Sequence, residues 1–67
     1  MSDREREDFI QSIAATIERN NCAIKREDLY KKYSNTERDK IKRIVEVMLR
    51  RGTLKYDARD DKYWLIL

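Results

Sequence analysis

Residues 41–52 read Ile-Lys-Arg-Ile-Val-Glu-Val-Met-Leu-Arg-Arg-Gly, and this stretch decides the fold class. Its apolar residues recur at the i, i+3, i+4, i+7, i+8 spacing of one helix face: Ile41, Ile44, Val45, Met48 and Leu49. Gly52 follows at the position of a C-terminal cap glycine. Upstream, Ser34 and Glu37 have the spacing of a capping box. We therefore predict a helix over residues 36–51 whose apolar face packs against a core.

A longer helix is predicted at the start of the chain. Ser2 and Glu5 form a second capping-box pair. Asn20 and Asn21 tolerate the left-handed turn that ends a helix, so we expect this helix over residues 3–20. Its apolar residues share one helical stripe: Phe9, Ile10, Ile13, Ala14 and Ile17.

The segment between these helices predicts a second, shorter helix over residues 26–33, because Leu29, Tyr30 and Tyr33 return to helical spacing. Residues 22–24 are too short for more than a single bridge of sheet. The connection to the third helix is only Ser-Asn-Thr, residues 34–36, as in a helix-turn-helix.

The C-terminal residues predict a β-hairpin over residues 53–67 with a polar turn at residues 57–61. In the last strand, Tyr63, Leu65 and Leu67 share one face, and Trp64 and Ile66 share the other. Both faces are apolar, so one packs on the helices and the other is covered by the third helix, a partner or a second copy. The fold class is α+β: one domain of three helices and a short hairpin, at residues 1–67.

Positive charge is concentrated in the middle of the chain. The net charge is +3, but residues 25–51 carry ten basic and five acidic groups, whereas residues 1–24 carry three and five. A basic helix-turn-helix is typical of nucleic-acid binding. The alternative is a solvated face, since four acids precede a base at i, i+4: Glu27–Lys31, Asp28–Lys32, Asp39–Arg43 and Glu46–Arg50.

Six bases have no acid in that position: Lys25, Arg26, Arg38, Lys40, Lys42 and Arg51. Arg38 and Lys42 are themselves i, i+4, a like-charge pair that destabilises a helix unless an anion relieves it. We therefore favour binding of an anionic partner over a purely structural role for these charges.

Other function classes find little support. The chain has no histidine and a single cysteine, Cys22, which we interpret as a small buried hydrophobe rather than a metal ligand. We expect no enzymatic activity, cofactor or metal site. No signal peptide or membrane span is expected, so the cytoplasm is the predicted location. The abundance of Lys, Arg and Glu is typical of proteins from thermophiles.

The chain resembles the winged helix-turn-helix superfamily in three segments. Cys-Ala-Ile-Lys-Arg-Glu-Asp-Leu at 22–29, Ile-Val-Glu-Val-Met-Leu-Arg-Arg-Gly-Thr-Leu-Lys-Tyr at 44–56 and Tyr-Trp-Leu-Ile at 63–66 are similar to small archaeal winged-helix regulators. They are also similar to the C-terminal winged-helix domain of the archaeal minichromosome maintenance helicase. The resemblance implies binding of double-stranded DNA, as in a small transcription regulator, or a protein-interaction module of a replication or transcription machine.

These expectations name specific residues. Trp64 and Ile66 are the candidate contacts for a protein partner. A partner that binds the basic face instead is expected to be acidic. The chain itself is expected to be a monomer or a homodimer. The candidate contacts with DNA are Lys25, Arg26, Arg38, Lys40, Lys42, Arg43, Arg50, Lys55, Arg59 and Lys62.

Overall fold

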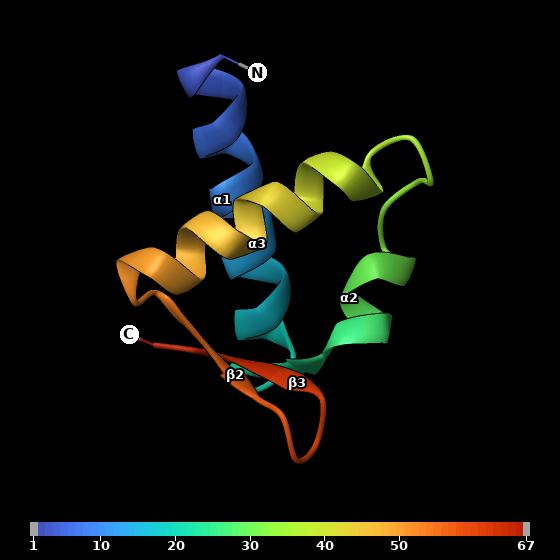
Figure 1. Cartoon of the computed structure of the whole chain (residues 1–67), viewed down its shortest axis with the longest axis vertical. Helices are drawn as coiled ribbons and strands as arrows, with labels where there is room; N and C mark the ends of the chain where they lie inside the picture. Colours follow the sequence, from blue (N-terminus) through green and yellow to red (C-terminus); the bar gives the residue numbers. More distant parts are fainter. Residues whose placement is uncertain (1, 67) are drawn as a thin grey trace.

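The computed structural model describes residues 2–66 and has three helices and a three-stranded antiparallel sheet (Figure 1). Helix α3 crosses α1, and the sheet lies at the end of α1 away from the N-terminus, with α2 to one side. The predicted α+β class is therefore confirmed. The elements are α1 Asp3–Arg19, β1 Ala23–Lys25, α2 Arg26–Lys31, α3 Arg38–Arg51, β2 Leu54–Asp57 and β3 Lys62–Leu65.

Helix α1 begins and ends close to the predicted positions. The Ser2 side chain accepts a hydrogen bond from the Glu5 backbone N–H at 3.1 Å, which confirms the N-terminal cap. At the other end, Asn21 has a φ of 62° and Cys22 a φ of 64°. Two consecutive left-handed residues turn the chain sharply at the end of the helix, and the Cys22 N–H donates to the Ile17 carbonyl at 2.9 Å.

The sheet has one strand more than the predicted hairpin. Residues 23–25 form β1, which pairs antiparallel with β3 over three residue pairs, from Ala23↔Trp64 to Lys25↔Lys62. The expectation of a single bridge was wrong because the tight turn before β1 aligns it with β3, and the Leu65 N–H donates to the Cys22 carbonyl at 2.8 Å. The Cys22 side chain is only partly buried, which corrects its interpretation as a buried hydrophobe.

Helix α2 is shorter than predicted and α3 starts later, so the connection between them covers residues 32–37. The N–H groups of Lys32 and Tyr33 bond to carbonyls three residues back, which tightens the end of α2 into a turn. Ser34 and Glu37 interact as their spacing predicts, since the Glu37 carboxylate accepts from the Ser34 N–H at 3.3 Å. They close a separate turn instead of capping α3, because the first α3 bond runs from the Ile41 N–H to the Glu37 carbonyl.

The core is built from the apolar stripes of the helices and the inner face of the sheet. Gly52 ends α3 in the left-handed conformation, with a φ of 78°, as predicted. Of the stripe of α3, Leu49 is only partly buried. The buried residues are Ile13, Ile17, Ile24, Leu29, Ile41, Ile44, Val45, Met48, Leu54 and Tyr63.

The last strand buries one of its two apolar faces. Tyr63 is buried and Leu65 packs against the core, whereas Trp64 and Ile66 are 40% and 48% exposed on the opposite face. The sequence left open which face is buried, and the structure assigns Tyr63 and Leu65 to the core. Leu67 lies outside the described residues. Within residues 2–66, no helix combines the length and apolar character needed to cross a lipid bilayer.

Replacing Met48 by alanine tests the core. Its side chain is 1% exposed at the centre of the α3 stripe, so we expect Met48→Ala to lower the free energy of unfolding by about 2–5 kcal/mol. Chemical denaturation measures this change, and Gln11→Ala, an exposed change on α1, serves as the control. Equal stability of the two variants would contradict burial of this face.

Amide hydrogen exchange tests the third strand. The N–H groups of Arg26 and Leu65 donate to the Asp61 and Cys22 carbonyls across the β1–β3 pair, so both should exchange slowly. The backbone amides of Ala58 and Asp60 in the exposed turn should exchange fast. Fast exchange at Leu65 with slow exchange in α3 would mean that the β1–β3 pairing is absent.

Candidate nucleic-acid interface

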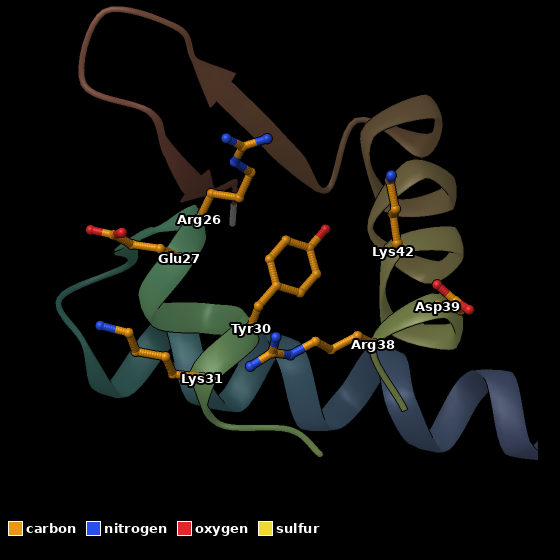
Figure 2. A pocket seen from close by; sticks show the side chains of 7 residues that line it. All are labelled: Arg26, Glu27, Tyr30, Lys31, Arg38, Asp39 and Lys42. Atoms are coloured by element: carbon orange, nitrogen blue, oxygen red, sulfur yellow. The ribbon is translucent and has the colours of Figure 1, made fainter. Parts of the chain in front are cut away.

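An open groove of about 420 Å³ lies between α2 and the first two turns of α3. Figure 2 shows the Tyr30 ring pointing into this space and the Arg38 side chain reaching across it from α3. Lys42 lies one turn further along α3, and Arg26 stands at the start of α2. The lining residues are Arg26, Glu27, Tyr30, Lys31, Arg38, Asp39 and Lys42.

The acids of this lining point away from the centre of the groove. In Figure 2, Glu27 extends to the far side of α2, and Asp39 extends to the side of α3 that faces away from α2. The side chains nearest the centre are therefore Arg38, Lys42 and Tyr30, and Arg26, which pairs with Asp61, stands at the edge toward the hairpin. This arrangement favours an anionic ligand over a cationic one.

A second hollow of about 280 Å³ continues the groove toward the sheet. It shares Arg26, Tyr30 and Lys42 with the first and adds Tyr56 and Tyr63. Burial, and to a lesser degree the neighbouring Tyr30, raises the pKa of Tyr63, and a hydrogen bond to Asp61 is the main cause that raises the pKa of Tyr56. Both hydroxyls stay neutral at physiological pH, so they add no negative charge beside the cations.

Arg38 and Lys42 have no carboxylate within 4 Å among residues 2–66. Arg38 is also the first residue of α3, where the helix dipole is positive and a cation is unfavourable. Two features thus disfavour this arrangement in the free protein: the i, i+4 repulsion and the position at the helix N-terminus. An anion bound between the two side chains would relieve both.

The ion pairs differ from those expected within helices. None of the four predicted i, i+4 pairs forms within 4 Å in the part of the chain that the structure describes. Arg6 pairs with Asp3, but the other three pairs join separate elements: Arg26–Asp61 at 3.2 Å, Lys40–Glu5 at 3.0 Å and Arg51–Glu7 at 3.5 Å. Three of the six bases that lack a helical partner therefore have a tertiary one.

The ten predicted DNA contacts fall on several surfaces. Arg26, Arg38 and Lys42 line the groove. Lys40 lies on the opposite flank of α3, where Glu5 of α1 binds it, so the structure separates it from the groove. The remaining six lie elsewhere: Arg43 and Arg50 are exposed on α3, Arg59 lies in the β2–β3 turn, and Lys25, Lys55 and Lys62 belong to the sheet.

The three lysines of the sheet occupy its outer face. Leu54 and Tyr63 are buried on the face toward the helices, so their strand neighbours Lys55, Lys62 and Trp64 point to the other side. Lys55 and Lys62 therefore lie on the hairpin apart from the groove cluster. Strand alternation was predicted for the last strand, but residues 22–24 were expected to form at most a single bridge, so the place of Lys25 in β1 was not predicted.

Sequence reasoning also missed the tyrosines of the groove. Tyr30 was assigned to the core stripe of α2, but the structure leaves it half-buried with its ring in the groove. Tyr56 was assigned only to the hairpin, and it is 41% exposed with its hydroxyl bonded to Asp61. The sequence did contain a signal for Tyr30: it directly follows Leu29, so a helix places it at the edge of the apolar stripe and not at its centre.

Comparisons with models of known protein families, with curated proteins and with solved structures found no match for this chain. The geometry described above is therefore the basis for any functional inference.

Alanine at Arg38 tests the repulsion in the groove. We expect Arg38→Ala to leave the melting temperature unchanged or slightly raised, because it removes both the i, i+4 repulsion and a cation at the helix N-terminus. Lys40→Ala is the matched control, since it removes the same type of charge on the same helix but breaks the pair with Glu5, at a cost of up to about 1 kcal/mol. Thermal unfolding at low salt compares the two, and a larger loss for Arg38→Ala would contradict the described electrostatics.

Proposed function

We propose that this chain is a winged helix-turn-helix domain that binds double-stranded DNA, as a small transcription regulator does. The order of elements, with β1 between the first two helices and a hairpin after the third, supports the winged-helix assignment. The observation that carries the DNA proposal is the Arg38 and Lys42 pair, which lines an open groove and has no carboxylate within 4 Å among residues 2–66. Phosphate fits such a pair because it accepts hydrogen bonds from both side chains, and a DNA duplex presents phosphates along its whole length.

In this proposal α3 enters the major groove, as the second helix of a helix-turn-helix does. Its 14 residues give a length of about 21 Å, and a major groove about 12 Å wide admits one helix. Arg38 and Lys42 then meet one strand, with Arg26 at the start of α2 beside them. The exposed residues of α3 that would face the bases are Asp39, Arg43, Glu46 and Arg50, with Lys42 on the flank of that face.

The contacts between Arg26 and the β2–β3 turn support this placement on DNA. The Arg26 backbone N–H donates to the Asp61 carbonyl at 3.0 Å, and its guanidinium pairs with the Asp61 carboxylate. The turn is thus fixed relative to α2, and Arg59 is carried on it. In the proposal Arg59 contacts the DNA backbone beside the site where α3 binds.

A specific observation favours a second candidate function, a protein-interaction module. Glu27 and Asp39 also line the groove, and Glu46 lines its continuation toward the sheet. A lining of mixed charge suits a protein partner better than a polyanion, because each acid repels phosphate. In that case the basic side chains bind carboxylates of an acidic partner.

Binding to a random-sequence duplex at several salt concentrations tests the proposal. Replacing Arg38 or Lys42 by alanine should weaken binding and reduce the slope of log K against log salt by roughly 0.9 for each lost phosphate contact. Fluorescence anisotropy of a labelled 20-base-pair duplex provides the measurement.

Lys40→Ala is again the matched control, because it changes the net charge equally on the flank of α3 away from the groove. It should leave the salt slope nearly unchanged. Equal losses for all three variants would indicate attraction by overall charge alone. Wild-type protein without measurable duplex affinity at low salt would end the DNA proposal and favour the protein-interaction module.

A further inference from the structure

The outer face of the sheet carries an exposed aromatic ring in a basic setting. Trp64, the only tryptophan of the chain, is 40% exposed at the centre of β3, and Ile66 beside it is 48% exposed. Strand β3 lies between β1 and β2, so Trp64 has a neighbour on each side: Ala23 on β1 and Lys55 on β2. The small Ala23 side chain leaves space next to the ring.

Lysines surround this ring. The Lys62 ammonium nitrogen lies 4.7 Å from the centroid of the Trp64 ring, and Lys25 is the direct cross-strand partner of Lys62. Like charges in directly opposed positions destabilise a sheet unless an anion lies between them. Within residues 2–66, Lys25, Lys55 and Lys62 have no carboxylate within 4 Å.

A hollow of about 440 Å³ adjoins the ring on the β1 side. Trp64, Lys25 and Lys62 line it together with two amides, Asn20 and Asn21, from the end of α1. The Asn20 amide nitrogen already donates to the Ala23 carbonyl at 2.6 Å, which leaves its side-chain oxygen free to accept.

Two acids lie close to these lysines. Asp28 lines the hollow, and Asp57 is the cross-strand partner of Lys62 on β2. The Asp57 carboxylate accepts a hydrogen bond from the Arg59 N–H at 3.0 Å, which holds it toward the turn. Three lysines against two carboxylates leave the surface around Trp64 with a positive excess.

We propose that this face, formed by Trp64, Lys25, Lys55, Lys62, Asn20 and Asn21, binds single-stranded DNA. A base stacks on the Trp64 ring where the Lys62 ammonium now lies, and Lys62 moves to a phosphate together with Lys25 or Lys55. The amides in the adjoining hollow accept from and donate to the edge of a base. A duplex does not fit this chemistry, because the faces of its bases are stacked on each other, and an acidic peptide offers charge without a planar ring.

The choice of deoxyribose over ribose is based on the apolar neighbours of the Trp64 ring. Ile66 and Ala23 flank Trp64 and have no polar side-chain atom that could pair with a 2′-hydroxyl. These apolar neighbours offer a 2′-hydroxyl no hydrogen bond, so this side of the ring does not favour ribose, and the proposal is made for deoxyribose. The proposal uses none of the groove cations Arg26, Arg38 and Lys42, and it is therefore independent of duplex binding.

Titration with (dT)12 tests the proposal, because intrinsic fluorescence from the single tryptophan reports on this face alone. Stacking of thymine on Trp64 should quench the emission. Trp64→Ala should weaken binding of labelled (dT)12 by roughly 5- to 100-fold, as expected for the loss of one base–aromatic stack. Lys25→Ala, an exposed change that leaves the core intact, should reduce the salt slope by roughly 0.7.

Matched variants separate this proposal from the duplex proposal. Arg38→Ala should weaken duplex binding and leave (dT)12 binding unchanged, and Trp64→Ala should do the reverse. Binding of poly-glutamate of equal charge as tightly as (dT)12, or failure of (dT)12 to quench Trp64, would overturn the proposal. Tighter binding of (rU)12 than of (dT)12 would overturn the assignment to DNA. A homodimer that Trp64→Ala dissociates would identify a second copy as the occupant instead.

Discussion

The pairing of β1 with β3 is the constraint on which the rest of the structure depends. It is made possible by the left-handed turn at Asn21 and Cys22, which directs the chain from the end of α1 along the last strand. Because α2 starts directly after β1, the same pairing places α2 beside the β2–β3 turn and opposite α3. The groove on one side of the sheet and the lysines around Trp64 on the other both follow from this one contact.

Local signals in the sequence predicted the three helices, but not the end of α2 or the start of α3. The apolar stripe from Ile41 to Met48 and the cap glycine after it predict α3, because both signals come from residues of the helix itself or directly after it. The Ser2 cap of α1 is local in the same sense. The Ser34–Glu37 contact was also predicted, but the contact alone does not determine whether a turn or a helix follows.

Features that depend on distant residues could not be derived in this way. A three-residue strand such as β1 has too little periodicity to be recognised, and its partner is remote in sequence. The charges show the same limit, because Lys40, Arg51 and Arg26 find acids on other elements and not at i, i+4. The sequence singled out Arg38 and Lys42, which the structure brings together in one groove, but it did not show that Glu5 binds Lys40 or that Lys25 lies beside Lys62 on the sheet.

The β1–β3 contact has a consequence for how the domain folds. Ala23 and Trp64 are joined by about forty residues of chain, so their pairing requires closure of a long loop whose entropic penalty is repaid only when the sheet and core form together. Loss of β3 would leave β1 without its partner strand and α2 without the hydrogen bond from Arg26 to the hairpin. Opening of this pair would therefore disturb both surfaces, because β1 and β3 carry the lysines beside Trp64 and the same pair holds α2 beside the hairpin.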